Sequence, residues 1–197
     1  MTYTDDFLAD SKKIIDLLDR AAIERIAVEL GALRSRGGRL FILGSGGGAG
    51  HASHAVNDFR KIAGIEAYAP TDNVSELTAR VNDEGWDTSY SNWLRVSRID
   101  ASDAILVFSV GGGDSARGIS VNLVRCIELA REVGATVLGI VGRDGGYTAA
   151  VGEAVIIPPV NGDTITPQTE GFQAVIWHLL VSHPAVRKNP GKWESTT

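Results

Sequence analysis

The stretch RLFILGSGGGAGHASHAVND, residues 39–58, decides the fold of this chain. Its first six residues, 39–44, form a short apolar run that stops at a glycine, which is typical of a fully buried strand. A glycine-rich turn follows, and the segment 48–63 is predicted to be helical. A strand, a glycine loop and a helix in this order predict one unit of a parallel α/β sheet, with the loop at the carboxyl end of the strand.

The same order of elements recurs later in the chain. The segment SDAILVFSVGGG (102–113) predicts a second strand that runs into a second glycine loop, and the segment 115–134 predicts the amphipathic helix after it. Strands are also predicted at 65–69, 135–142 and 153–159, a loop at 70–76, and helices at 5–36 (two, or one that is broken), 85–96 and 166–183. Strands rich in Val, Ile and Leu that alternate with helices indicate an α/β fold of three layers, αβα, in which helices cover both faces of a parallel sheet.

Length and composition limit the classes of function. The 197 residues suit one domain, with N-terminal helices over 1–37, an α/β core over 38–183 and a C-terminal tail over 184–197. A formal net charge of −5 gives no general attraction to nucleic acid or to an anionic membrane, so neither is expected as a partner. No apolar stretch approaches the roughly 20 residues that span a bilayer. The only cysteine, Cys126, excludes an intrachain disulfide and a multi-thiolate metal site, which favours the cytoplasm.

The first glycine loop matches a dinucleotide-binding pattern only weakly. Gly44, Gly46 and Ala49 satisfy G-x-G-x-x-G/A, which many strand-to-helix turns also contain. The pattern requires an acidic residue at the end of the next strand, whereas Glu66 opens that strand. We therefore expect no nucleotide cofactor.

A cradle for a single phosphate group explains both glycine loops better. Glycines let backbone N–H groups approach an anion, and Ser109 and Ser115 flank three glycines in the second loop. Neither loop, 44–50 or 109–115, contains Lys or Arg, so we expect neutral donors to hold a small phosphorylated ligand. The alternative is a tight turn in which Asp114 or Ser115 only caps the next helix.

Histidines and carboxylates follow the first loop and recur near the C-terminus. His54 and Asp58 are four residues apart and share one helical face, while His51 lies either near the loop or toward solvent. Glu170 and His178 lie on the last helix, where the apolar neighbours of His178 slightly favour a core position. His54, Asp58, Glu170 and His178 together suit zinc binding or proton transfer. Glu170 and His178 are about 12 Å apart along a straight helix, too far to share one ion unless the helix bends or two subunits contribute.

Five segments together resemble the sugar isomerase (SIS) domain family, and within it the phosphoheptose isomerases. They are LGSGGGAGHASHAVNDF, TDNVSELTARVNDEGWD, FSVGGGDSARG, GIVGRDGGYTA and TEGFQAVIWHLL, in the family's order, and the resemblance covers about residues 5–183. It implies a flavodoxin-like sheet and a homotetramer with active sites between subunits. It also implies a phosphorylated sugar substrate whose phosphate is bound by the two glycine-serine loops, through Ser45, Gly46, Gly47, Gly48, Ser109, Gly111, Gly112 and Ser115.

The resemblance also assigns roles to the polar residues. Asp58 matches the catalytic base, and His178 matches the acid or its partner. Zn²⁺ is implied at His54, Asp58, Glu170 and His178, and Asp83 matches an aspartate that contacts sugar hydroxyls. The implied reaction converts sedoheptulose 7-phosphate to D-glycero-D-manno-heptose 7-phosphate through an enediol.

The chain also departs from the family pattern. Asp58 replaces a glutamate, Glu170 a glutamine and Gly48 a serine, and the second loop is longer by several residues. Two alternatives therefore stay open: a non-catalytic SIS module that senses a sugar phosphate or binds a protein partner, and an isomerase or lyase of another phosphosugar.

Overall fold

The computed structural model describes residues 2–190 and contains a five-stranded parallel sheet. The strand order is β2-β1-β3-β4-β5, the flavodoxin-like order. This result confirms the predicted fold class. The strands are β1 (Leu40–Gly44), β2 (Ala67–Tyr68), β3 (Ala104–Ser109), β4 (Thr136–Val141) and β5 (Glu153–Ile156).

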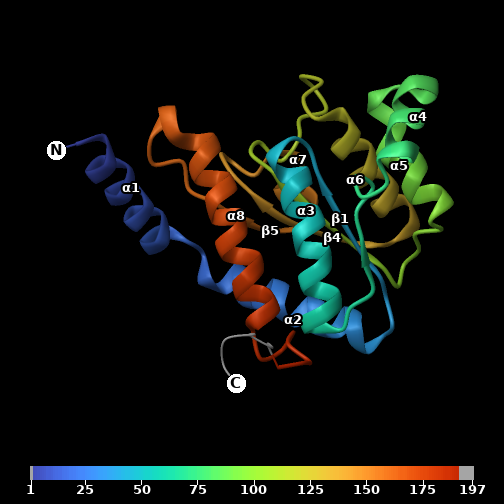
Figure 1. The fold of residues 1–197 in the computed structure, drawn as a ribbon, viewed down its shortest axis with the longest axis horizontal. Helices are drawn as coiled ribbons and strands as arrows, with labels where there is room; N and C mark the ends of the chain where they lie inside the picture. The colour runs from blue at the N-terminus through green and yellow to red at the C-terminus, as the bar shows by residue number, and fades with distance from the viewer. Residues whose placement is uncertain (1, 191–197) are drawn as a thin grey trace.

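Helices cover both faces of this sheet (Figure 1). One face carries α2 (Arg20–Ser35), α3 (Gly47–Asp58) and α8 (Ile165–Ser182), and the other carries α4 (Val74–Glu84), α5 (Trp86–Val96) and α6 (Val121–Val133). Helix α1 (Tyr3–Leu17) extends away from the body of the molecule, and the short α7 (Gly146–Val151) precedes β5. Directly after Asp58, α3 continues as one π-helical turn, Phe59–Ala63. Among the described residues, no helix combines the length and apolar character needed to cross a bilayer.

The alternation of side chains along the central strands builds the two cores. In β1, Leu40 and Ile42 pack toward α2, α3 and α8, whereas Phe41 and Leu43 pack toward α5 and α6. All four side chains are at most 1% exposed. A strand that is buried on both faces reads as a continuous apolar run, which is why this strand could be recognised in the sequence.

Two helices were not predicted. The segment 70–76 was assigned as a loop, but α4 begins at Val74 because the Asn73 side chain accepts a hydrogen bond from the Glu76 amide and caps the helix. None of the side chains of α4 is buried, but Val74, Leu77 and Val81 recur at helical spacing, so the sequence does carry a signal for this helix. Helix α7 has only six residues.

The helix predicted from residue 115 starts later. Asp114 and Ile119 form an antiparallel bridge that closes a short excursion, residues 114–119, and α6 begins only at Val121. Ser120, in a left-handed conformation (φ 52°, ψ 47°), occupies the N-cap position. The assignment of Asp114 or Ser115 as the helix cap was therefore wrong.

The first part of the predicted C-terminal tail packs against the body of the protein. Val186 is fully buried, and its carbonyl accepts a hydrogen bond from Arg34 on α2. The amides of Lys188 and Asn189 donate to the Ile62 carbonyl. Residues 191–197 of the tail lie outside the described residues.

Candidate active site

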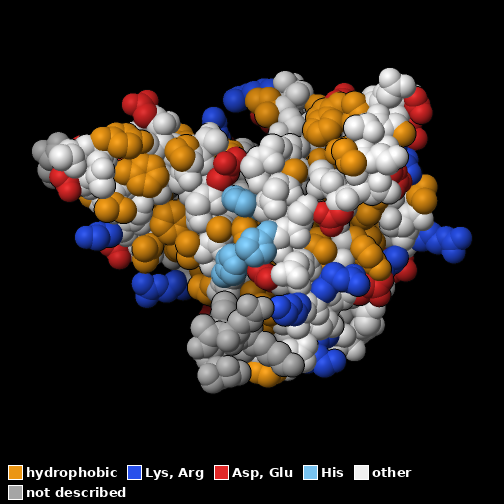
Figure 2. Space-filling model, viewed as in Figure 1, with side chains coloured by type: hydrophobic (Ala, Val, Ile, Leu, Met, Phe, Trp, Pro, Cys, Tyr) orange, Lys and Arg blue, Asp and Glu red, His pale blue; other side chains and the backbone are white. Residues whose placement is uncertain are grey.

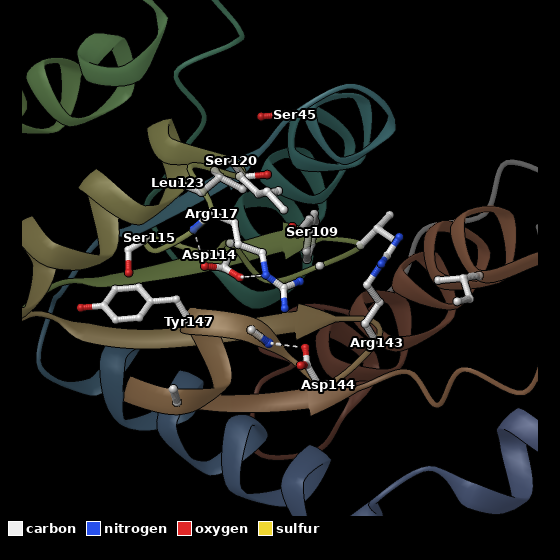
Figure 3. Close-up of a pocket in the computed structure, with 18 of the residues that line it drawn as sticks. Ser45, Ser109, Asp114, Ser115, Arg117, Ser120, Leu123, Arg143, Asp144 and Tyr147 are labelled. Carbon is white, nitrogen blue, oxygen red and sulfur yellow. Dashed lines mark hydrogen bonds and ion pairs between the residues drawn. The ribbon is translucent and has the colours of Figure 1, made fainter. Parts of the chain in front are cut away.

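A cavity of about 850 Å³ opens at the carboxyl ends of β3 and β4, between the second glycine loop and the turn that precedes α7 (Figure 3). Four residues predicted to bind the substrate line it: Ser45, Ser109, Gly111 and Ser115. Ligands of parallel α/β sheets bind at this edge.

Two serine hydroxyls in this region are held by internal hydrogen bonds. Ser45 Oγ accepts a hydrogen bond from Asn122 Nδ2 over 3.1 Å, and Ser109 Oγ accepts one from the Gly112 amide over 3.0 Å. Each oxygen accepts one hydrogen bond from within the protein; the Ser109 proton can turn toward an anion, whereas the Ser45 hydroxyl also contacts the Tyr90 side chain. Asn122 is fully buried, and its Oδ1 has no hydrogen-bond partner among the described residues. No pattern in the sequence pointed to Asn122.

The start of α6 supplies further donors. Ser120 lines the cavity, and the first amides of a helix have no partner within the helix, which suits them to bind an anion. The prediction placed Ser115 at this helix start. Because residues 114–119 come before the helix, Ser120 and not Ser115 lies at the start of α6. Ser115 is exposed at the cavity wall.

Glycine at position 112 holds the second loop against the next turn. Its φ is +70°, and a Cβ there would lie 1.9 Å from the Gly145 carbonyl oxygen. The Gly112 carbonyl accepts hydrogen bonds from the Thr148 amide and hydroxyl, over 3.0 and 2.7 Å. This glycine is therefore buried against protein. It shapes the cavity and is not among the residues that line it.

A buried tyrosine fixes the end of β1 where the first loop begins. The Tyr90 hydroxyl donates to the Gly44 carbonyl over 3.0 Å, and the side chain is 1% exposed. Burial raises the pKa of Tyr90 to about 12. Tyr90 is thus a neutral donor at ordinary pH, which keeps the first loop in place.

The cavity also contains positive charge, contrary to the expectation of neutral donors alone. Arg117 and Arg143 both line it, as Figure 3 shows. Both lie just outside the segments 44–50 and 109–115. The excursion brings Arg117 to the cavity, and the turn after β4 brings Arg143.

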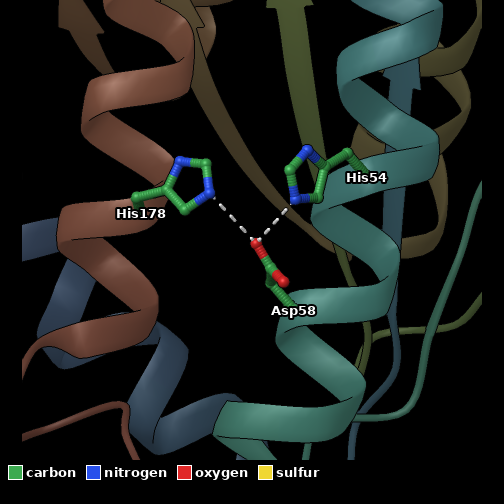
Figure 4. A group of neighbouring side chains, drawn as sticks. All are labelled: His54, Asp58 and His178. Carbon is green, nitrogen blue, oxygen red and sulfur yellow. Dashed lines mark ion pairs between the residues drawn. The ribbon is translucent and has the colours of Figure 1, made fainter. Parts of the chain in front are cut away.

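A second cluster lies where α3 and α8 pack together (Figure 4). His54 Nε2 is 3.5 Å and His178 Nε2 is 3.4 Å from the same oxygen, Asp58 Oδ2. Asp58 is buried (7% exposed), whereas about half of each imidazole is exposed. The slight preference for a core position of His178 was wrong, because this face of α8 lies open beside α3.

Hydrogen bonds fix the orientation of this cluster. His178 Nδ1 is 2.7 Å from the Ala174 carbonyl, which only accepts, so Nδ1 carries a proton and Nε2 is the nitrogen that faces Asp58. Trp177 Nε1 donates to Asp58 Oδ2 over 3.3 Å, and Asn57 Nδ2 donates to Oδ1 over 3.1 Å.

The donor set fits a divalent metal ion. One ligand atom from each of His54, Asp58 and His178 lies within 4.8 Å of the others. Lone pairs that converge on one point repel each other unless a cation or a proton lies between them. Two imidazoles and a carboxylate are a usual zinc set that leaves a coordination position open, and the Ala174 carbonyl orients His178 as outer partners of metal ligands do.

The structure does not bring Glu170 to this cluster. A Cβ built on Gly47 would lie 2.5 Å from Glu170 Oε1, so the carboxylate rests against the first residue of α3. It is two turns of α8 away from His178, and the predicted role of Glu170 as a fourth metal ligand has no geometric support within one chain. Asp83, predicted to contact sugar hydroxyls, lies exposed on the last turn of α4 and does not line the cavity.

His51 faces α8, not open solvent. Its Nδ1 is 3.1 Å from Gln173 Oε1, while Gln173 Nε2 donates to the Ile140 carbonyl over 3.0 Å. The Ile140 carbonyl fixes the orientation of the Gln173 amide, so His51 Nδ1 donates to Gln173 Oε1. The side chain lies against Trp177, with ring centroids 5.0 Å apart.

Comparisons with known proteins agree with this fold, although no family model matches the chain. A phosphoheptose isomerase from Rhodospirillum rubrum is 34% identical over 165 residues, 81% of this chain and 82% of that protein. A probable phosphoheptose isomerase from Thermoplasma volcanium is 31% identical over 182 residues, 90% of this chain and 88% of that protein. The solved structure of a phosphoheptose isomerase from Neisseria gonorrhoeae has the same fold, with a TM-score of 0.75 at 23% identity over 91% of this chain and 96% of that chain. The chain therefore belongs to the phosphoheptose isomerase family of SIS domain proteins.

Proposed function

We propose that this protein is an aldose-ketose isomerase that converts sedoheptulose 7-phosphate to D-glycero-D-manno-heptose 7-phosphate. The observation that carries the proposal is the convergence of His54, Asp58 and His178 on α3 and α8, since α3 follows closely on Ser45, which lines the cavity. The names of the relatives support the choice of substrate. Such a substrate and the single, buried Cys126 suit the cytoplasm.

The length of α3 separates the two ends of the proposed site. From Gly47 to Asp58 the helix rises about 16 Å at 1.5 Å per residue. A ligand held by its phosphate in the cavity must therefore be extended to bring its other end toward Asp58.

The phosphate is held by Ser45, Ser109, Ser120 and the first amides of α6. All three serines line the cavity. The exchange between ketose and aldose requires a base that removes a proton from the carbon beside the carbonyl, and an acid that moves protons between the oxygens.

We assign the base to Asp58 and the acid to His178. The indole N–H of Trp177 holds the carboxylate, and the Ala174 carbonyl holds the imidazole. The aspartate side chain is about one methylene shorter than the family's glutamate, and reactivity is sensitive to displacements of about 1 Å. Because Trp177 and Asn57 hold the Asp58 carboxylate, its position relative to the substrate is set by the position of α3.

Zinc would be held by His54, Asp58 and His178, the three residues whose donor atoms converge. When bound, it would polarise the substrate's oxygens as a Lewis acid. Glu170 is left out of this ligand set because its carboxylate lies at the start of α3.

We further propose a homotetramer with active sites between subunits. Exposed apolar side chains lie on α1 (Leu8, Ile15) and beside His178 on α8 (Val175, Leu179). Figure 2 shows apolar side chains gathered over α1 and histidines exposed near the middle of the same face. Association of subunits would cover these apolar surfaces and the half-exposed imidazoles together.

Deuterium exchange tests the activity. Metal-replete protein in deuterated water should convert sedoheptulose 7-phosphate and place label at C1 or C2. Asp58→Asn should abolish exchange and leave phosphosugar affinity nearly unchanged, while Asp87→Asn, an exposed control on α5, should behave as the wild type. Tight phosphosugar binding without conversion would favour a sensor, and unaltered turnover in Asp58→Asn would remove Asp58 as the base.

A further inference from the structure

We propose that Arg117 and Arg143 determine the affinity of the cavity for a dianionic phosphate monoester, and that Arg117 exchanges Asp114 for the phosphate on binding. The inference deepens the proposed function and rests on it for the identity of the sugar. It concerns the charge of the site, which the serines and backbone amides do not provide.

Arg117 is placed at the cavity by the 114–119 excursion. The Asp114–Ile119 bridge closes this excursion directly before α6, so Arg117 lies three residues from Ser120 and the free amides of that helix. Its Nε is 3.4 Å from Asp114 Oδ2, and its side chain is 78% exposed. An exposed ion pair of this length contributes little to stability, so a phosphate can displace the carboxylate.

Arg143 reaches the cavity from another wall. It lies in the turn after β4 with φ +54°, a conformation that is uncommon for residues other than glycine. It makes no ion pair with any described carboxylate. In Figure 3, Ser109 lies between Arg117 and Arg143. Strained backbone that presents a side chain to a cavity is a feature of functional sites.

The two acidic residues of the cavity wall are turned toward the backbone. Asp114 Oδ1 accepts from the Arg117 amide over 2.9 Å, and Asp144 Oδ1 accepts from the Gly146 amide over 3.1 Å. These bonds hold the turns and engage one oxygen of each carboxylate; Asp114 Oδ2 still pairs with Arg117 Nε, and a phosphate would take its place. One guanidinium group can donate two parallel hydrogen bonds to two oxygens of a phosphate. The two arginines therefore favour binding of a dianionic phosphate over binding of a neutral sugar.

Calorimetric titration with inorganic phosphate tests the proposal without any requirement for turnover. Arg117→Ala and Arg143→Ala should each weaken binding about 10-fold, the factor that corresponds to about 1.4 kcal/mol and to a charge-assisted hydrogen bond. Arg117→Lys should lose less, because it keeps the charge. Arg125→Ala, an exposed arginine on α6 paired with Glu128, makes the same charge change away from the cavity and should have little effect.

Asp114→Asn should act in the opposite direction. It keeps the oxygen that accepts the Arg117 amide and removes the competing charge, so phosphate should bind about threefold more tightly. This gain should disappear in the Arg117→Ala background. If residues 114–119 had only a structural role, Asp114→Asn and Arg117→Ala would both weaken phosphate binding.

Wild-type affinity in Arg117→Ala and Arg143→Ala, or a loss no larger than in Arg125→Ala, would overturn the inference. Weaker binding in Asp114→Asn would overturn the exchange of partners. These outcomes are separate from the fate of the proposed function. Phosphate binding that depends on Arg117 without isomerisation would refute only the function, and isomerisation with an unchanged KM in both arginine variants would refute only the inference.

Discussion

Replacement of Trp177 by phenylalanine is expected to weaken zinc binding about 10-fold. The indole N–H donates to Asp58 Oδ2 over 3.3 Å, and the same oxygen faces both imidazoles. A hydrogen bond to a charged group contributes about 1.5–3 kcal/mol, and the length of this one favours the lower value. That value corresponds to roughly a factor of 10 in affinity, the lower end of the 10–100-fold loss seen when the outer partner of a metal ligand is removed.

The variant should stay folded. Trp177 is 1% exposed and stacks on Phe108 with ring centroids 5.6 Å apart, so the smaller ring leaves unfilled space. The expected cost is about 1–3 kcal/mol, below the stability of about 5–15 kcal/mol of a typical domain. Loss of zinc affinity can therefore be measured on native protein.

The assay is competition between the protein and a chelator of known zinc affinity, with urea unfolding of the metal-free protein alongside. Ile176→Val is the matched control, because Ile176 is fully buried on the same helix and has no hydrogen bond to Asp58. It should lose about 0.5–1.5 kcal/mol of stability and bind zinc normally. Equal zinc affinities in wild type and Trp177→Phe would refute the role of the indole, and equal losses in the two variants would show general loosening of the core.

Three further predictions concern stability and are measured by urea unfolding. Gly112→Ala should cost about 3 kcal/mol or more, because φ is +70° and the new Cβ meets a carbonyl oxygen at 1.9 Å; a smaller loss would contradict the packing of the loop. Asp103→Asn should cost about 3–5 kcal/mol, since this carboxylate, 1% exposed, accepts from Arg39 Nη2 over 2.6 Å; Glu132→Gln, at an exposed pair, should cost less than about 1 kcal/mol. Burial raises the pKa of the Cys126 thiol, so only the unfolded chain loses this proton above about pH 8.5. The free energy of unfolding should therefore fall as pH rises from 8.5, less steeply in Cys126→Ala, and equal slopes would contradict the shift.

The sheet was predictable because each central strand is buried on both faces and so appears as an uninterrupted apolar run. The start of α6 could not be predicted in the same way, because Ile119 and Val121 continue the apolar spacing of the helix toward the N-terminus, through residues 114–119. Only the backbone stops the helix there: Gly118 has φ +67° and Ser120 has φ 52°. Local apolar periodicity carries no information about such a turn.

The candidate site was predictable where it depends on spacing within one helix. His54 and Asp58 are four residues apart, and the structure brings them to 3.5 Å of each other. Asn122 and Arg117 reach the cavity through the excursion and the start of α6, and no local pattern reveals these contacts. The exposure of His178 depends on which face of an apolar helix is left uncovered, and Leu179 beside it is 40% exposed as well.

The two glycine loops look alike in sequence but differ in charge, and this difference explains where the phosphate would bind. At the first loop, the Glu170 carboxylate rests against Gly47 and already supplies an anion to the positive end of α3. At the second, the start of α6 faces a cavity that also holds Arg117 and Arg143. A dianion placed at the start of α3 would meet a like charge, whereas at α6 it would meet helix amides and two guanidinium groups, beside two carboxylates, Asp114 and Asp144, that each accept a hydrogen bond from a backbone amide. The helix that carries Asp58 thus has its positive end satisfied from within the protein, which leaves α6 as the anchor for a ligand that extends toward Asp58.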